Sequence, residues 1–318
     1  MNKEISGKKI AIFGGSGFIG SHLVNHLCKY SCQIDIVTRG NSKKLDFFLG
    51  SEPGQVRVVN LKEFSKESLD SVLNGVDIIF NLIGILYETK KNSFEKVHVS
   101  ILSEIASSAV RNGVRGFIHL SALNIDKTKE SSYARSKLKG EDSLKSKFPN
   151  CVIVRPSVVF GKRDNFTNLF SNLSNFSPFL PLIGTPEIKI KGIVPTVNFK
   201  KRVKFQPVYV GDLVTFLIAI CSQRKKTFDL AGPLVQSFDS IFDVILKTKN
   251  RRRIYLPIPL FVGRVMAFFL EALPFPPLIT RDQIKLLSYD NISTKGFINL
   301  KRIVRNPTSL QSIAETYL

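Results

Sequence analysis

The stretch FGGSGFIGS occupies residues 13–21 and continues a short apolar run that begins at Ile10. The run is typical of a buried β-strand, and residues 18–27 carry apolar side chains at helical spacing. The glycines of the stretch therefore stand at a strand-to-helix turn. Such a turn brings main-chain N–H groups close to a bound pyrophosphate. We expect a dinucleotide to contact Gly14, Gly15, Ser16, Gly17, Phe18, Ile19 and Gly20.

Strand-like and helix-like segments alternate through the first half of the chain. This alternation predicts an α/β fold with a Rossmann-like, doubly wound parallel sheet. After Pro156 the pattern loosens. We expect an NAD(P)-binding domain over residues 1–160 with returning elements near 205–232, and a smaller C-terminal α/β lobe over residues 161–318 with a basic insertion near 185–202. The expected strands are Ile10–Phe13, Gln33–Thr38, Val56–Val59, Asp77–Leu82, Gly116–Leu120 and Cys151–Val154.

The composition indicates a folded intracellular chain with an unusual charge. Of the 318 residues 43% are hydrophobic, and we interpret the four scattered cysteines as reduced thiols. The N-terminus has no apolar signal segment, so we expect a cytoplasmic chain. Solvated basic faces, an anionic membrane surface or an acidic partner each fit the net charge of +21. No nucleic-acid-binding motif is present, and His22 and His26 lack a third ligand, so we expect neither nucleic acid nor a metal.

The end of the second expected strand carries a basic residue. In dinucleotide-binding folds an acidic side chain at this point holds a ribose 2′-hydroxyl, whereas a basic one accepts a 2′-phosphate. Arg39 stands there, about 20 residues after the last glycine of the turn, while Asp35 lies too early, inside the strand. We therefore favour NADP(H) over NAD(H), with Lys43 or Lys44 assisting Arg39.

Tyr133 and Lys137 form a Y-x-x-x-K pattern. Positions i and i+4 share a helix face, so the ammonium can lie beside the phenol, lower its pKa and bond a ribose. Ser121 follows the fifth expected strand, where its hydroxyl can polarise a carbonyl oxygen together with the tyrosine. The three residues are the candidate catalytic set. Whether they perform chemistry or only hold a cofactor stays open.

The order of these motifs resembles that of the extended or atypical short-chain dehydrogenases/reductases. The glycine turn, Ser121, Tyr133 and Lys137 all occur in the family's order, as do the segments NLIG at residues 81–84 and RPSVVFG at residues 155–161. Asn60 and Leu61 stand where relatives usually carry Asp-Leu or Asp-Val. The resemblance implies further cofactor contacts at Asn60, Leu61, Asn81, Ile83, Gly84, Tyr133, Lys137 and Pro156.

The second half of the chain narrows the resemblance. The segments FQPVYVGDL at residues 205–213, FDLAGP at 228–233 and LITRDQ at 278–283 resemble the branch containing the 39-kDa-type accessory subunit of respiratory complex I. This resemblance implies a tightly held NADPH and a role as accessory or assembly subunit. It also implies hydrophilic-arm subunits as partners and a peripheral position on the cytoplasmic face of the inner membrane. Two alternatives stay open: an active reductase or epimerase acting on a carbonyl or nucleotide-sugar substrate, and a factor in ubiquinone biosynthesis.

Residues 260–273 read LFVGRVMAFFLEAL and lie between two prolines. A helix of fourteen residues extends about 21 Å, which is short of the roughly 30 Å hydrocarbon core of a bilayer. It is therefore too short to span. The segment can lie in a membrane interface, with the basic cluster Arg251–Arg253 beside it, or pack as ordinary core of the C-terminal lobe.

Overall fold

The computed structural model describes residues 4–40, 52–191, 194–198 and 202–318. Its centre is a seven-stranded sheet in the order β13-β6-β5-β4-β1-β2-β3, with every neighbouring pair parallel. The predicted Rossmann-like parallel sheet is therefore confirmed. The strands are β1 (Lys9–Phe13), β2 (Gln33–Thr38), β3 (Val56–Asn60), β4 (Ile78–Asn81), β5 (Gly116–Leu120), β6 (Val152–Pro156) and β13 (Lys226–Leu230).

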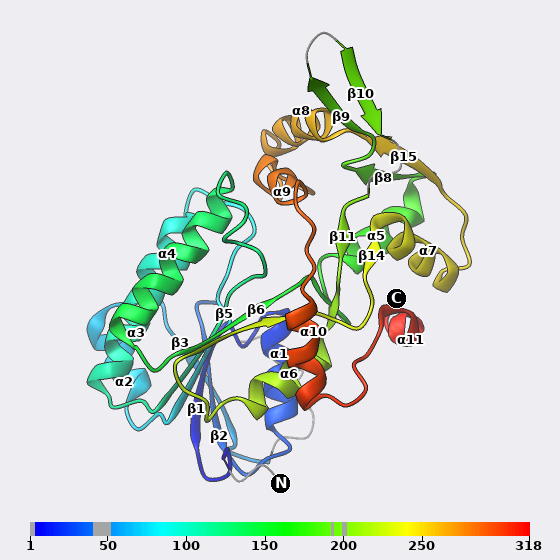
Figure 1. Ribbon diagram of the computed structural model, residues 1–318. Helices are drawn as coiled ribbons and strands as arrows, with labels where there is room; N and C mark the ends of the chain where they lie inside the picture. The colour runs from blue at the N-terminus through cyan, green and yellow to red at the C-terminus, as the bar shows by residue number, and fades with distance from the viewer. Residues whose placement is uncertain (1–3, 41–51, 192–193, 199–201) are drawn as a thin grey trace.

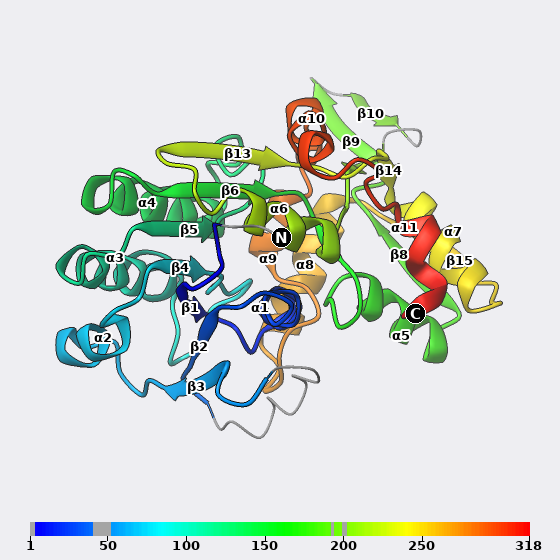
Figure 2. The same cartoon turned by 90° about the horizontal axis from the view of Figure 1, so that it is seen from below.

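Helices cover both faces of the sheet (Figure 2). Side chains alternate along each strand, so Ile10 and Ile12 enter one core while Ala11 and Phe13 enter the other. The first core is closed by α1 (Phe18–Leu27), α6 (Val210–Ala219) and α10 (Thr294–Ile303). The second is closed by α2 (Lys66–Leu73), α3 (Ile101–Arg111) and α4 (Ser132–Lys147), with the π-helix η2 (Glu95–Ser100) leading into α3. We call this assembly the sheet lobe.

The chain reverses its direction across the sheet at β1. From β1 it proceeds to β2 and β3 on one side, and it then returns to β4 on the other side. In doubly wound sheets a crevice forms outside the carboxyl ends of the two strands that flank such a reversal, and ligands bind there. In this chain the crevice lies between the residues that follow β1 and those that follow β4.

A second body lies beyond the carboxyl ends of the strands (Figure 1). A phenylalanine-rich core that includes Phe170, Phe238 and Phe242 holds this C-terminal lobe together. Its elements are α5 (Thr167–Phe176), β8 (Phe179–Ile183), α7 (Phe238–Thr248), β15 (Ile254–Ile258), α8 (Leu260–Glu271), α9 (Arg281–Leu286), α11 (Leu310–Ile313) and η3 (Ala314–Thr316). Short strands join the lobes: β7 (Val159–Phe160), β11 (Lys204–Phe205), β12 (Val208–Tyr209) and β14 (Gln236–Ser237).

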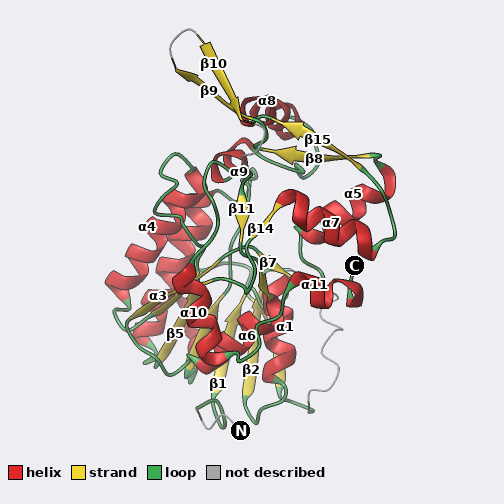
Figure 3. Ribbon diagram, turned by 45° about the vertical axis from the view of Figure 1, so that its right-hand side comes forward, coloured by secondary structure: helices red, strands yellow, loops and turns green. Residues whose placement is uncertain are grey.

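Most of the predicted basic insertion forms an antiparallel hairpin. Its strands are β9 (Glu187–Lys191) and β10 (Val194–Asn198), and it projects beyond α8 (Figures 1 and 3). The predicted division of the chain into two domains near residue 160 stays a prediction. In the structure, the second half of the chain contributes β13 to the sheet and packs α6 and α10 on it.

The helix α8 packs on the C-terminal lobe with a narrow stripe. Only Gly263 and Ala267 are buried in it. Within the described residues, no helix is both long enough and apolar enough to span a bilayer. The exposed large apolar side chains of α8 and the following segment are called the α8 face, and they are Phe261, Val265, Met266, Phe268, Phe269, Leu273, Phe275 and Leu278.

Candidate functional site

The glycine turn between β1 and α1 lies in the crevice at the carboxyl ends of β1 and β4. Gly14 has a φ of +82°, and a Cβ there would lie 3.1 Å from the carbonyl carbon of Leu82. A Cβ on Gly20 would lie 2.2 Å from the carbonyl oxygen of Gly14. Glycine is therefore required at position 14 by the backbone angle and at position 20 by the close approach of α1 to the turn.

The N-terminus of α1 suits a negatively charged ligand. Its N-cap is Gly17, which has no side chain to satisfy the first N–H groups, and its first turn carries no acidic residue. These N–H groups and the helix dipole favour a phosphate at this point. Ser16, Phe18 and Ile19 are half-buried around the same turn.

Several residues expected to contact a cofactor have other contacts that limit their role. The buried amide of Asn81 is hydrogen-bonded to Nδ1 of His119 at 3.1 Å, and its Oδ1 accepts from the N–H of Ile83 at 3.3 Å. The side chain of Leu61 is only 4% exposed and packs in the core, so only its main chain is left for a ligand. Asn60 is exposed at the end of β3, and Pro156 is buried at the end of β6.

Arg39 lies exposed just after β2. Its guanidinium donates to Oδ1 of Asn92 at 2.9 Å, which links β2 to the loop after β4. The position is open to a second acceptor, because an arginine has five N–H donors. Lys43 and Lys44, which were expected to assist it, lie outside the described residues.

The helix α4 begins at a well-defined cap and is fixed in its middle. The hydroxyl of Ser131 accepts from the N–H of Ala134 at 3.1 Å, which is a standard N-cap contact. Further along, Arg155 of β6 donates twice to the fully buried carboxylate of Glu141, at 2.8 and 2.7 Å. Tyr133 and Lys137 lie between these two anchors.

Lys137 is 4% exposed and its Nζ donates to the carbonyl oxygen of Leu120 at 3.2 Å. Burial lowers the pKa of this ammonium to about 8, although the charge of Glu141 acts in the opposite direction. A Cβ on Gly84 would lie 3.3 Å from the same Nζ, so the residues after β4 and the α4 lysine meet in the crevice. The structure therefore brings Gly84 and Lys137 together, and their expected cofactor contacts stay a prediction.

The ring of Tyr133 packs against two other rings. It lies edge-on to Phe94 and His98, with centroids 5.9 and 5.4 Å away. The Nδ1 of His98 is bonded to the hydroxyl of Ser136 at 2.8 Å, and its Nε2 accepts from the N–H of Ile85 at 3.2 Å. Burial, followed by the charge of Lys137, lowers the pKa of His98 to about 3, so the imidazole is neutral. In this apolar setting burial raises the pKa of Tyr133 to about 12.

Ser121 follows β5 and is 6% exposed. In the part of the chain that the structure describes, its hydroxyl is buried without a hydrogen-bond partner. A buried polar group left unpaired costs about 1–3 kcal/mol. A ligand oxygen or amide at the carboxyl end of β5 would remove this cost, so Ser121 fits a bound nucleotide or substrate.

Sequence reasoning missed one contact to the Tyr133 helix. Asp282 of α9 accepts hydrogen bonds from the hydroxyl of Ser131 at 2.7 Å and from the main-chain N–H groups of Ser132 and Tyr133 at 2.9 Å each. Burial by itself would raise the pKa of Asp282, but these bonds outweigh it and hold the pKa below its ordinary value. The LITRDQ segment carried the signal, but no role could be assigned to it without the tertiary contact.

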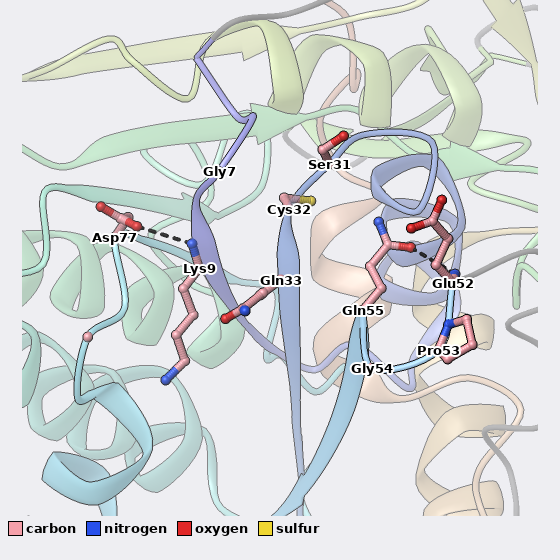
Figure 4. Close-up of a pocket in the computed structure, with 11 residues that line it drawn as sticks. Gly7, Lys9, Ser31, Cys32, Gln33, Glu52, Pro53, Gly54, Gln55 and Asp77 are labelled. Atoms are coloured by element: carbon pink, nitrogen blue, oxygen red, sulfur yellow. Dashed lines mark hydrogen bonds between the residues drawn. The ribbon is translucent and has the colours of Figure 1, made fainter.

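Two hollows flank the sheet at opposite ends. A cleft of about 990 Å³ separates the loop of Tyr87 and Phe94 from the α8–α9 turn, and Ser132 and Asp282 line it. A second hollow of about 570 Å³ lies at the amino-terminal ends of the strands, where Lys9, Gln33 and Gln55 line it (Figure 4). The glycine turn, Ser121 and Lys137 line neither of these hollows. Because the glycine turn and Ser121 follow the carboxyl ends of β1 and β5 and Lys137 lies in the crevice, we assign the candidate site to the carboxyl end of the sheet, beside the larger cleft.

This chain is similar to a protein family profile and to subunits of NADH:ubiquinone oxidoreductases. The sequence profile of the NmrA-like family matches residues 6–146. NADH dehydrogenase (ubiquinone) 1 alpha subcomplex subunit 9, mitochondrial, from Mus musculus is 30% identical over 312 residues, which cover 97% of this chain and 79% of the relative. The NADH-ubiquinone oxidoreductase 40 kDa subunit, mitochondrial, from Neurospora crassa is 25% identical over 99% of this chain and 80% of the relative.

Solved structures share the fold at much lower identity. An NADPH-dependent quinone oxidoreductase from Escherichia coli complexed with NADPH has a TM-score of 0.71 at 16% identity, over 97% of this chain and 100% of that one. A UDP-glucuronic acid 4-epimerase from Bacillus cereus in complex with UDP-glucuronic acid and NAD has a TM-score of 0.70 at 16% identity, over 97% of each chain. These likenesses show the Rossmann-like fold.

The match to the mouse relative extends through both lobes, because it covers 97% of this chain. It confirms the resemblance that the order of the sequence motifs indicates. The chain therefore belongs to the family of the NADH dehydrogenase (ubiquinone) 1 alpha subcomplex subunit 9 proteins.

Proposed function

We propose that this protein is an NAD(P)-binding accessory or assembly subunit of an NADH:ubiquinone oxidoreductase, in which the nucleotide has a structural role. The relatives named for that enzyme match nearly the whole chain, at 25–30% identity. A role in assembly requires surfaces for partners and a stable fold, but it does not require turnover. Both lobes therefore contribute to the proposal, the first through the nucleotide crevice and the second through the α8 face.

The nucleotide site is supported chiefly by the glycine turn. Gly14 and Gly20 keep the main chain close to the start of α1, where uncapped N–H groups point into the crevice between β1 and β4. The unpartnered hydroxyl of Ser121 and the buried ammonium of Lys137 lie along the same carboxyl edge, after β5 and beside Gly84. These groups fit a dinucleotide laid across the strand ends.

NADP(H) is the favoured form of the cofactor. Arg39 stands at the end of β2, where the adenosine ribose lies in folds of this type, and its planar guanidinium suits a phosphate. Of the described residues at this point, Thr38, Arg39 and Gly40, none is acidic. Asp35 lies inside the strand and pairs with Arg57 through bonds of 2.8 and 2.7 Å. An NAD(H)-specific site would need such a carboxylate.

The partners we propose are hydrophilic-arm subunits and an anionic membrane surface on the cytoplasmic side of the inner membrane. Eight of the nineteen exposed large apolar side chains of the described residues belong to the α8 face. Arg264 is exposed on the same helix, and the chain as a whole carries a charge of +21. Aromatic side chains beside arginine on a helix too short to span suit the interface of an anionic bilayer.

The basic cluster at residues 251–253 contributes less to this surface than expected from the sequence. The guanidiniums of Arg251 and Arg253 donate to the carbonyl oxygen of Ser174, at 3.0 and 2.7 Å, near the end of α5. They therefore stabilise the C-terminal end of that helix. Arg252 is exposed.

The proposal is tested by two measurements on the purified full chain. NADPH fluorescence should show binding to the wild type and no binding to the Gly20→Val variant, because a side chain there displaces α1 from the turn. Affinity purification from solubilised membranes should recover hydrophilic-arm subunits of the oxidoreductase. A correctly folded chain that binds neither NADPH nor NADH would overturn the nucleotide role, and recovery of the chain without those subunits would overturn the assembly role.

A second candidate function is a reductase or epimerase acting on a carbonyl substrate. The buried Ser121 hydroxyl without a partner favours it, because a substrate oxygen could accept that hydrogen bond. Tyr133 would then exchange a proton at its hydroxyl. Its pKa of about 12 is raised by burial and is not lowered by Lys137, whose Nζ donates to Leu120, so this function requires a bound substrate or cofactor to lower that pKa. Replacing Tyr133 by Phe decides between the two functions. A loss of the cellular role with NADPH still bound indicates chemistry, and an unchanged role with intact assembly indicates a structural nucleotide.

A further inference from the structure

The carboxylate of Asp282 belongs to one lobe and fixes a helix of the other. Asp282 is the second residue of α9 and lies 150 residues after Ser132, the first residue of α4. It receives three donors at the start of α4, which are the Ser131 hydroxyl and the N–H groups of Ser132 and Tyr133. The N–H groups at a helix start have no partner within the helix, so a carboxylate there stabilises it.

The α9 helix is in turn tied to α8. The main-chain N–H and the Nε of Arg281 donate to the two carboxylate oxygens of Glu271, at 2.6 and 2.7 Å. The guanidinium also lies over the ring of Phe268, 5.1 Å from its centroid. The side chains of Thr280 and Gln283 cap α9 reciprocally, which fixes the orientation of the helix around Asp282.

A second contact follows the same path between the lobes. Lys285, one turn after Asp282, donates to the carbonyl oxygen of Glu130 at 3.3 Å, in the loop that precedes α4. The α8–α9 hairpin therefore holds both the last loop residue and the first turn of α4. In Figures 1 and 3, α9 lies near the upper end of α4.

The residue held most directly is Tyr133. Its own N–H is one of the three donors, and Lys137 follows one turn later on the same face. Loss of the Asp282 carboxylate would leave these N–H groups to fray at the point where the helix meets the crevice. The position of Tyr133 relative to Ser121 then depends on a residue of the C-terminal lobe.

We propose that Asp282 is a positioning residue through which nucleotide binding at the α4 helix and the seating of the α8–α9 hairpin stabilise each other. The inference rests on the proposed nucleotide site. Coupling of this kind is reciprocal, so a nucleotide that orders α4 must strengthen the hairpin contact by the same factor. A partner that binds the α8 face would in this way be favoured by a filled nucleotide site.

The first test compares NADPH dissociation constants of the wild type, Asp282→Asn and the control Asp243→Asn by fluorescence, at a temperature where circular dichroism shows each folded. An amide cannot accept all three donors, and we expect binding about tenfold weaker in Asp282→Asn, within the usual range of coupling between sites. Asp243→Asn makes the same exchange at an exposed carboxylate of α7, whose partner is the hydroxyl of Tyr255 and not the hairpin or α4, and it should stay within about twofold of wild type. Equal affinities of Asp282→Asn and wild type, or an equal loss in the control, would overturn the proposal.

The second test needs no folded variant. Amide hydrogen exchange of residues 280–287 in the wild-type chain should slow when NADPH is added, although the hairpin contributes no expected cofactor contact. Asp282→Asn should lose this protection if it folds. NADPH that binds and protects α1 and α4 while leaving residues 280–287 unchanged would overturn the coupling alone. A wild type that binds no nucleotide overturns the proposed nucleotide site itself, so the two failures are distinguishable.

Discussion

The helices α6 and α8 are both strongly apolar, yet they have opposite environments. In α6, which reads VGDLVTFLIA, seven of ten residues are buried, between the sheet, α1 and α10. In α8, which reads LFVGRVMAFFLE, only two of twelve residues are buried. Most apolar side chains of α6 pack within the chain, whereas five of the large apolar side chains of α8 are exposed: Phe261, Val265, Met266, Phe268 and Phe269.

This difference shows where the molecule has an exposed apolar surface. Contiguous exposed apolar patches on soluble proteins commonly mark sites of interaction with membranes or other proteins. The α8 face carries four phenylalanines from Phe261 to Phe275, and it lies at the end of the C-terminal lobe away from the sheet (Figure 3). We therefore place the proposed nucleotide site in the sheet lobe and the proposed docking surface in the C-terminal lobe.

The largest expected difference between α6 and α8 is in the loss of stability when an apolar side chain is truncated. Leu217 of α6 is fully buried, and we expect Leu217→Ala to lower the free energy of unfolding by about 4 kcal/mol, because it leaves a cavity. Phe269 of α8 is 65% exposed, so Phe269→Ala should change the free energy of unfolding by less than about 0.5 kcal/mol. Urea denaturation followed by circular dichroism measures both, and comparable losses would mean that α8 is structural core.

The next effect concerns membrane binding. We expect the wild type to sediment with vesicles that contain anionic phospholipid, and the double variant Phe261→Asp, Phe269→Asp to bind about a hundredfold more weakly, at roughly 1.5 kcal/mol for each ring. Val110→Asp is the matched control, since Val110 is 54% exposed on α3, in the sheet lobe. Equal binding of the double variant and the control would remove the membrane from the proposal.

A smaller effect is expected on the coenzyme preference of the proposed nucleotide site in the sheet lobe. We expect Arg39→Asp to shift the ratio of NADPH to NADH affinity toward NADH by about tenfold, because a carboxylate repels a 2′-phosphate and holds a 2′-hydroxyl. Vesicle binding should be unchanged, as Arg39 lies on the sheet lobe. Fluorescence titration with each coenzyme checks the first point, and an unaltered preference would contradict the assignment of Arg39.

The smallest effect is a difference in pH dependence. Lys137, with its pKa lowered to about 8 by burial, is a cation at pH 7 and neutral at pH 9.5. NADPH affinity should therefore fall as the pH rises through about 8, by about fivefold, as a charge-assisted hydrogen bond becomes a neutral one. Lys137→Met should bind NADPH with no such dependence. Vesicle binding through Arg264 should stay level over the same range, because arginine keeps its charge.

The sheet could be predicted from the sequence because its signals are local. The apolar runs at residues 10–13 and 116–120 and the glycines between β1 and α1 specify strand, turn and helix without reference to distant residues. The expected strand Val56–Val59 differs from β3 by one residue, and Asp77–Leu82 is longer than β4 by one residue at each end. Such differences at strand ends reflect backbone pairing with a neighbour.

The parts that could not be predicted depend on contacts between distant segments. The burial of Leu61, the Arg39 contact to Asn92 and the three bonds accepted by Asp282 each join residues from different elements. The exposure of α8 belongs to the same class, since its sequence equally suits a buried helix. The expected roles of Ser121, Tyr133 and Lys137 stay predictions that the proposed experiments test.

The buried ion pair of Glu141 and Arg155 restricts how this chain can diverge. Glu141 is fully buried, and Arg155 is its bidentate partner. Loss of Arg155 would leave the buried carboxylate with only Lys145, whose Nζ lies 3.5 Å from it, and loss of Glu141 would leave the guanidinium of Arg155 without its bidentate partner. Breaking a buried pair costs about 3–5 kcal/mol, whereas exchange of both members for apolar residues of similar volume is often neutral. We therefore expect single replacements at either position to be destabilising. Among relatives of this chain, we expect the two positions to covary.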